Sequence, residues 1–376
     1  MSKAAILLAE LVALPSVNPA FMPAGDPRAG EQRVADYIAA AALSARLDVE
    51  MQPVFPGRLN VLARLVPPQP ATSRILLAPH LDTIGDATMP PEMFLPQVRD
   101  GRLHGRGACD TKGSVAAMLT ALMEVAMSGR RPQQTEVVFA GLVDEEESQS
   151  GSRALARSGI QADLAIVGEP TELKIITAHK GDLWLKVRTH GTAAHGSKPH
   201  LGVNAIQAMI PILQWIKEEY AQELQKRKHP LLGAPTINIG SIHGGTQPNI
   251  VPDFCEISLD RRTVPAESDE FVLQEISKGI APFGGELISS KGNSCLPMET
   301  DPNLPLVRQF FSLAGQEKPL GVDFFCDASI LAASGIASIV FGPGSIAQAH
   351  TADEFIELTS LENGTDLLIR FLRSLP

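Results

Sequence analysis

Short apolar runs and helical patterns alternate over the first half of the chain, and an apolar run returns near the C-terminus. The runs are almost uninterrupted, as expected for strands that are covered on both faces of a sheet. We expect such strands at residues 60–66, 75–79, 136–143, 164–168 and 337–342. Helices with apolar residues three or four positions apart are expected at 3–14, 29–46 and 113–127. Strands that alternate with helices predict an α/β layer with a mostly parallel sheet.

The middle of the chain follows a different pattern. Apolar and polar residues alternate at 183–189 and 255–262, which is typical of an antiparallel sheet with one face in water. Between and after these segments we expect strands at 236–242 and 286–290 and helices at 202–227 and 268–281. The resulting order, β-α-β-β-α-β, predicts a ferredoxin-like α+β fold. Pro211 is expected to kink the first of the two helices.

The length of the chain favours two domains, because 376 residues are too many for one ordinary core. We predict a large α/β domain with a mostly parallel mixed sheet flanked by helices, formed by residues 1–180 and 292–376. The α+β domain at 181–291 would be inserted into it.

Composition and charge exclude some classes of partner. Hydrophobic residues make up 44% and charged residues 20%, which is usual for a globular protein in water. A net charge of −10 argues against a nucleic-acid partner, which would need a basic surface. The four cysteines include no CxxC pair, so we expect reduced thiols and a cytoplasmic protein. We expect no signal peptide and no membrane span, because no uncharged apolar run reaches about 18 residues.

Histidine and acidic side chains follow several of the predicted strands. In an open α/β sheet, the carboxyl ends of the strands form the edge where ligands bind. The candidate residues are His80, Asp82, Asp110, the acidic run 144–147, Glu169 and His350. Taken alone, a histidine and an aspartate two positions apart, such as His80 and Asp82, are weak evidence for a metal site, and a loop histidine beside a helix-capping or turn aspartate is the better explanation.

The other candidates also have simpler explanations when taken one at a time. Asp110 could cap the helix that follows it, and the run 144–147 could be a solvated helix start. Glu169 could be a turn residue and His350 a partly buried core histidine. Together, however, two histidines and several carboxylates form a set that suits zinc, with cobalt or manganese as substitutes. The set is large enough for two ions.

Five segments carry a resemblance to a known family, and they occur in the family's order across nearly the whole chain. These are His80 to Thr83, Gly105 to Gly113, Asp144 to Glu146, Gly168 to Thr171, and Gly342 to Glu354. They resemble the dinuclear zinc aminoacylase/carboxypeptidase family of metallopeptidases. That family includes acetylornithine deacetylase, succinyl-diaminopimelate desuccinylase, aminoacylase and glutamate carboxypeptidase. Among these members, the segments most resemble those of acetylornithine deacetylase.

The resemblance implies two Zn²⁺ ions per subunit, with Co²⁺ or Mn²⁺ as substitutes. Asp110 would bridge the two ions. His80 and Glu169 would complete one site, and Glu146 and His350 the other.

The resemblance also implies two residues that act beside the metal ligands. Asp82 would orient the His80 imidazole, and Glu145 would be the general base that moves a proton from a metal-activated water to the leaving amine. The run of glutamates leaves the register open. A shift by one position would make Glu146 the base and Glu147 the ligand.

The inserted domain would serve as a lid and as the interface of a homodimer. The resemblance implies that His195 reaches the partner subunit's site and hydrogen-bonds the oxyanion. Asn249 could contact the substrate, and Arg262 could hold a substrate carboxylate through two hydrogen bonds. Gly344, between the last strand and His350, is a further candidate for substrate binding.

The function that fits best is metal-dependent removal of an acyl group from an N-acyl amino acid. A glutamate-carboxypeptidase-like peptidase and a succinyl-diaminopimelate desuccinylase-like enzyme are the alternatives, with a small N-acyl amino acid or a short peptide as substrate. A metal-binding relative without turnover is disfavoured, because Glu145 and a complete set of ligands are present. Phosphate-ester chemistry would need a longer phosphate-binding loop than Gly105-Arg106-Gly107.

Overall fold

The computed structural model describes residues 1–289 and 295–376, and it forms two compact units. The first unit comprises residues 1–177, 300–320 and 326–376, and the second comprises 178–299 and 321–325. The end of the predicted strand 286–290 and the predicted domain boundary at 291/292 fall outside the described residues. Within the described part of the chain, no helix has the length and apolar character needed to cross a membrane.

The first unit is built on a mixed sheet with strand order β1-β2-β6-β3-β7-β15-β8. The four central strands, β6, β3, β7 and β15, are parallel to one another, whereas the pairings outside this group are antiparallel. The bounds are β1 Asp48–Phe55, β2 Arg58–Leu65, β3 Ser73–Pro79, β6 Thr135–Gly141, β7 Leu164–Gly168, β15 Ser338–Val340 and β8 Ile176–His179. The predicted α/β layer with a mixed sheet is thus confirmed, and its parallel part is the group of four central strands.

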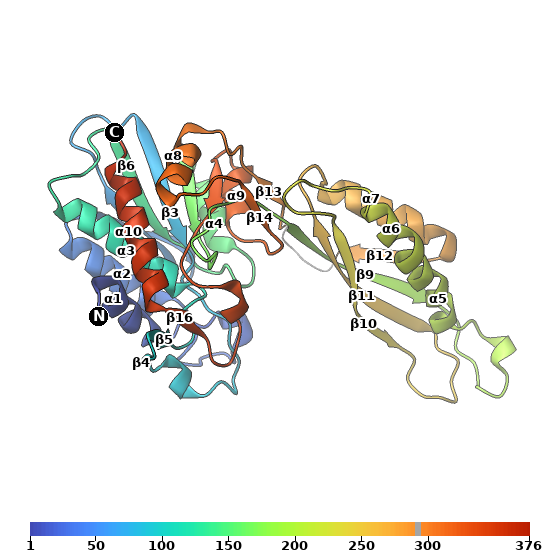
Figure 1. Cartoon of the computed structure of the whole chain (residues 1–376). Helices are drawn as coiled ribbons and strands as arrows, with labels where there is room; N and C mark the ends of the chain where they lie inside the picture. The colour runs from blue at the N-terminus through green and yellow to red at the C-terminus, as the bar shows by residue number, and fades with distance from the viewer. Residues whose placement is uncertain (290–294) are drawn as a thin grey trace. The chain divides into compact units, whose positions relative to one another are not determined.

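Helices cover both faces of this sheet (Figure 1). They are α1 Lys3–Val12, α2 Gln32–Ser44, α3 Lys112–Met127, α4 Ser150–Arg157, α8 Pro305–Ala314, α9 Ala328–Ala333 and α10 Leu358–Arg373. α3 packs between α1 and α10 and contacts β3, β6 and β7, while α4 packs against α9.

A small antiparallel sheet, β16-β5-β4, is formed by Phe355–Glu357, Arg102–His104 and Gln97–Arg99. The strands β13 (Met298–Glu299) and β14 (Leu320–Val322) pair with β8.

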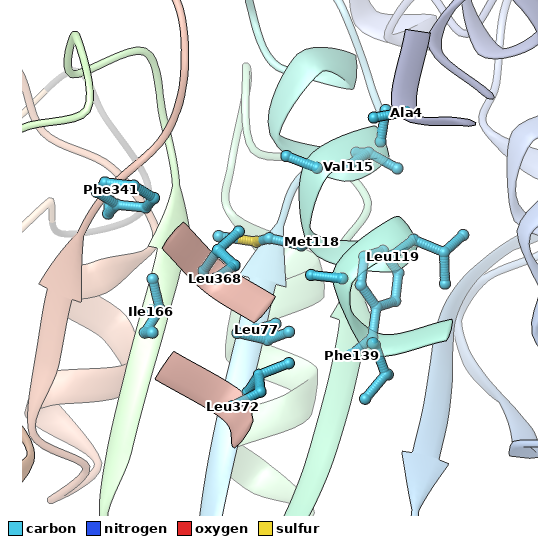
Figure 2. Close-up of a cluster of buried hydrophobic side chains, with 14 of the residues drawn as sticks. Ala4, Leu77, Val115, Met118, Leu119, Phe139, Ile166, Phe341, Leu368 and Leu372 are labelled. Atoms are coloured by element: carbon cyan, nitrogen blue, oxygen red, sulfur yellow. The ribbon is translucent and has the colours of Figure 1, made fainter. Parts of the chain in front are cut away.

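The core of the first unit explains why α3 is apolar almost all round. Met118 and Leu119 of α3 lie beside Leu77 of β3 and Phe139 of β6, and Leu368 of α10 closes the cluster (Figure 2). All of these side chains are buried. The buried cluster anchors α3 in the core, and the candidate ligand Asp110 lies two positions before its first residue, Lys112.

The second unit has the predicted β-α-β-β-α-β order. Its sheet has the strand order β10-β11-β9-β12 and is antiparallel throughout. Its elements are β9 Gly181–His190, α5 Ala205–Trp215, α6 Ala221–Leu224, β10 Thr236–Gly244, β11 Phe254–Thr263, α7 Asp269–Ile280 and β12 Glu286–Ser289. Alternate residues of β11 are buried, which confirms one covered and one wet face. The expected helix 202–227 is shorter and is divided. Pro211 lies inside α5, and a π-helical turn, Ile216–Tyr220, separates α5 from α6.

Candidate metal centre

The carboxyl ends of the parallel strands bring together side chains that are far apart in sequence. His80 directly follows β3, Glu169 directly follows β7, and Glu146 follows β6 by a short turn. His350 lies in the loop after β15, and Asp110 lies just before α3. Because parallel strands share one carboxyl edge, these five side chains converge in the first unit.

Two groups of possible metal ligands meet at Asp110. One ligand atom each from His80, Asp110 and Glu169 lie within 4.8 Å of one another, and so do those of Asp110, Glu146 and His350. The two oxygens of Asp110 face different histidines: Oδ1 lies 3.1 Å from His80 Nε2, and Oδ2 lies 3.4 Å from His350 Nε2. His350 Nε2 is also 3.2 Å from Glu146 Oε2. This is the arrangement that a carboxylate bridging two cations requires.

Asp82 fixes both the first histidine and the acidic turn. His80 Nδ1 lies 3.0 Å from the backbone oxygen of Asp82 and 3.5 Å from its Oδ1. A proton on Nδ1 would leave Nε2 free to bind a metal. The Asp82 carboxylate also accepts hydrogen bonds from the amides of Glu145 and Glu146, at 3.0 and 3.1 Å. Asp82 therefore positions the base candidate as well as the histidine.

The acidic run adopts one register in the structure. The carboxylate of Glu146 faces His350, whereas Glu147 is exposed. Glu145 lies outside both groups of possible ligands. Burial, together with the charges of Glu169 and Asp327, raises the pKa of Glu145 well above its usual value of 4.5, although the charge of His80 opposes this. Glu145 thus lies close enough to His80 and Glu169 for their charges to act on it, but it belongs to neither group of possible ligands.

The donors fit divalent cations on electrostatic grounds. Burial raises the pKa of Glu169 well above 4.5 and that of Glu146 to about 7, and the charge of Asp110 adds to both shifts. Hydrogen bonds that the His350 ring donates to the carboxylates of Asp110 and Glu146 raise the pKa of His350 to about 10. Among the described residues, the buried Oε1 of Glu146 has no hydrogen-bond partner. A bound cation would neutralise the charge of these closely spaced carboxylates and would give the unpaired oxygen a partner.

Glu354 is a structural residue of this centre to which the sequence analysis assigned no role. Its carboxylate accepts hydrogen bonds from the amides of Gly107, Cys109 and Asp110, each at 2.9 Å, and from Arg106 Nη1 at 2.8 Å. It therefore shapes the loop that presents Asp110. The only sequence signal is its position four residues after His350, and that signal does not reveal the contacts.

Asp327 is a second buried acid that sequence reasoning missed. It directly precedes α9 and accepts a hydrogen bond from Ser152 Oγ at 2.5 Å. Burial raises its pKa to about 6, and its charge contributes to the raised pKa values of Glu145 and Glu169. An aspartate before a helix resembles an ordinary cap, so the sequence carries no sign of this role.

Three of the residues that were predicted to contact the substrate lie in the second unit. In the second unit, His195 is exposed, with its Nδ1 2.8 Å from Ser197 Oγ, and Asn249 lies on a neighbouring loop whose backbone oxygen accepts from Gly196. Arg262 donates two hydrogen bonds to the carboxylate of Asp260, from Nε at 2.8 Å and from Nη2 at 3.0 Å. These contacts leave the three roles as predictions.

Gly344 belongs to the first unit, where its backbone has a φ of 91°. A Cβ at this position would come within 2.6 Å of Cys109 Sγ. Glycine is therefore required here for packing, and its role in substrate binding stays a prediction.

The fold and the paired ligand groups define a metal-dependent hydrolase that acts on amide bonds. Residues 76–374 match Peptidase family M20/M25/M40, and the chain belongs to this family. It is 31% identical over 376 aligned residues to "Acetylornithine deacetylase" of Shigella sonnei (strain Ss046), covering 96% of this chain and 95% of that protein.

Two solved structures share the fold at 20% sequence identity. One is a tripeptidase from Staphylococcus aureus subsp. aureus Mu50, with a TM-score of 0.78 over 99% of this chain and 97% of the other. The second is an M20 family metallo-carboxypeptidase from Sulfolobus solfataricus, with a TM-score of 0.77 over 99% of each chain. At this identity the likeness is one of fold.

Proposed function

We propose that this chain removes the acyl group from an N-acyl amino acid, in the manner of an acetylornithine deacetylase. The supporting observation is the 31% identity to such an enzyme across 96% of the chain. The paired ligand groups that share Asp110, with Glu145 beside them, are consistent with it. The substrate would be a small N-acyl amino acid that keeps its free α-carboxylate.

In this proposal, His80, Asp110 and Glu169 hold one divalent cation, and Asp110, Glu146 and His350 hold another. Zn²⁺ is the first candidate, since imidazole and carboxylate donors suit it, and Co²⁺ or Mn²⁺ could substitute. When bound, such ions lower the pKa of water to about 7 and polarise a carbonyl group.

Glu145 carries the proton in this reaction. Its carboxylate takes a proton from the water whose oxygen attacks the amide carbon. As the carbon–nitrogen bond breaks, Glu145 gives this proton to the leaving nitrogen. The carboxylic acid that forms passes its own proton to the amine, so that a carboxylate and an ammonium group are released. Asp82 keeps Glu145 in place through the hydrogen bond from the Glu145 amide at 3.0 Å.

The second unit would complete the site. We propose that His195 hydrogen-bonds the oxyanion of a partner subunit's substrate, that Arg262 binds the α-carboxylate, and that Asn249 contacts the substrate. Gly344, in the first unit, would contact the substrate as well. This requires a homodimer formed through the second unit. It also requires Arg262 to exchange its contact with Asp260 for the substrate.

Peptide hydrolysis is the second candidate, because the two structural relatives named above are a tripeptidase and a metallo-carboxypeptidase. A panel of N-acetyl, N-succinyl and N-formyl amino acids, dipeptides and tripeptides, assayed by amine release with zinc, cobalt or manganese, separates the two. We expect an N-acetyl amino acid to have a kcat/KM at least about tenfold above any peptide, a difference of about 1.4 kcal/mol in the barrier. Faster cleavage of a peptide, or no cleavage at all, would overturn the proposed function.

The ligand set also predicts how the stability of metal-stripped protein depends on pH. Folding raises the pKa of Glu146 from 4.5 to about 7 and that of His350 from 6.5 to about 10. The folded state thus holds both protons more tightly than the unfolded chain. The stability that these protons add is fully present at a pH below the pKa values of the unfolded chain. It is lost as the pH rises through the pKa values of the folded protein.

We therefore expect the Tm of chelator-treated protein to fall between about pH 5 and pH 9, by roughly 1–2 °C for each kcal/mol lost. Protein saturated with zinc should lose less over this range, because metal replaces these protons. Differential scanning calorimetry of both forms tests this. The buried Lys112 and His179, whose pKa values are lowered, titrate alike in both forms, so the difference in Tm is the decisive quantity. A difference that stays constant or shrinks as pH rises would contradict the assignment.

A further inference from the structure

A buried network of charged and polar side chains lies behind the turn that carries Glu145 and Glu146. Its members Asn18, Glu31 and Asp144 are at most 3% exposed, and the Arg58 side chain is 13% exposed. Burying such groups is unfavourable unless they are closely paired. Apolar residues of similar size would often give equal stability at such positions, so the pairing calls for a reason beyond stability.

Arg58 is the centre of this network. Its Nε and Nη2 donate to the two carboxylate oxygens of Glu31, at 2.7 and 2.6 Å. Nη2 also donates to Asp144 Oδ1 at 2.9 Å. Asn18 Nδ2 donates to the same Asp144 oxygen at 3.0 Å and to Asp82 Oδ2 at 2.8 Å. A continuous path of hydrogen bonds therefore joins Glu31 to Asp82.

This path holds three consecutive backbone amides of the turn. The amide of Asp144 donates to Glu31 Oε1 at 3.1 Å, and those of Glu145 and Glu146 donate to the Asp82 carboxylate. Asp144 has a φ of 70°, in the left-handed region that non-glycine residues seldom adopt. Such a conformation persists only where the surroundings determine it. Both buried carboxylates are therefore needed to keep the turn in shape.

The three supporting residues come from the first sixty positions, before the segment 76–374 that matches the family. Asn18 caps the short 3-10 helix Pro19–Phe21, Glu31 directly precedes α2, and Arg58 begins β2. We infer that Asn18, Glu31 and Arg58 are positioning residues that set the Asp144–Glu146 turn. They hold the Glu146 carboxylate against His350 and Glu145 beside the clusters. The catalytic part of this inference rests on the proposed function.

Replacement of Arg58 by methionine tests the inference. Amide exchange in the peptide 143–149 of metal-free protein should become at least tenfold faster. One of the two zinc ions should bind about 10–100-fold more weakly in chelator competition, the loss typical of residues that support metal ligands, with the other ion unchanged. We expect kcat to fall at least tenfold with KM within twofold. Arg64→Met is the matched control, because Arg64 lies on the same strand and pairs with Glu50 and Glu136 and not with the turn. It should change none of these quantities by more than twofold.

Two further variants separate positioning from a purely structural role. In Arg58→Met the carboxylate of Glu31 is left without its cation, so thermal stability should fall. The double variant Glu31→Gln, Arg58→Met removes both charges and should recover Tm without recovering fast zinc-dependent turnover or slow amide exchange. If Arg58→Met does not fold, Arg58→Lys serves instead. A lysine keeps the charge but cannot bond Glu31 at two oxygens and Asp144 together, so the same changes should appear at a smaller size.

Full recovery of exchange and zinc binding in the double variant, or unchanged values in Arg58→Met and Arg58→Lys, would overturn the inference. These readouts need no substrate, so they are distinct from a failure of the proposed function. Wild-type protein that binds two ions but cleaves no N-acyl amino acid would refute that function alone. The positioning role would then be decided by amide exchange and zinc affinity.

Discussion

Replacement of Glu145 by glutamine is expected to lower kcat by about 10²–10⁴-fold, the usual contribution of a general base, while both metal ions stay bound. Glutamine keeps the size and shape of the side chain but cannot accept a proton. Glu145 lies outside both ligand groups, so its loss should leave the metal affinity unchanged. Steady-state kinetics on an N-acyl amino acid, with metal content from elemental analysis of the same sample, measure both effects.

Two neighbouring substitutions make this test specific. Glu147→Gln should leave activity and metal content unchanged, because Glu147 is exposed. Glu146→Gln should lose metal, because its carboxylate faces His350 at 3.2 Å. If Glu146→Gln instead keeps its metal and loses activity, while Glu145→Gln remains active, the roles of the two glutamates are shifted by one position.

Sequence patterns predicted many of the strands and helices, because buried strands and helices have strong local signatures. The apolar run that ends at His80 and the nearly all-apolar segment of α3 both appear where they were expected. Parallel strands share one carboxyl edge, so residues that follow them had to come together. This argument brings His80, Glu169 and His350 to one place without any knowledge of side-chain geometry.

The register of the acidic run could not be read in this way. Three successive glutamates are chemically alike, and only contacts distinguish them. The amides of Glu145 and Glu146 are bound to Asp82, more than sixty positions earlier, and Asp144 turns the chain in the left-handed region. Together these contacts leave Glu147 facing water.

Long-range polar contacts were missed for a similar reason. Glu354 reaches the loop before α3 across 244 positions, and Arg58 reaches Asp144 across 86. Neither residue stands in a local pattern that differs from that of a surface charge. The division of the expected helix 202–227 by a π-helical turn likewise depends on packing and has no clear sequence signal.

Replacement of Asp110 by asparagine should weaken the binding of both ions. Each Asp110 oxygen faces a different histidine, so this residue is the only member shared by the two ligand groups among the described residues. An amide keeps the shape but offers one neutral oxygen and an NH₂ group that repels a cation. We expect an affinity loss of more than about 100-fold, beyond the 10–100-fold typical of residues that only support ligands.

Thermal unfolding detects this loss without any substrate. Zinc at about 100 times its Kd stabilises a folded protein by about 2.7 kcal/mol, so the Tm of wild-type protein should rise on addition of zinc. At the same zinc concentration, Asp110→Asn should show almost no rise, and its kcat/KM should fall in parallel. Asp86→Asn is a suitable control, because Asp86 is exposed and its carboxylate accepts a hydrogen bond from the amide of Thr88. This variant should keep the full zinc response. A normal zinc response in Asp110→Asn would mean that the two ions do not share this carboxylate.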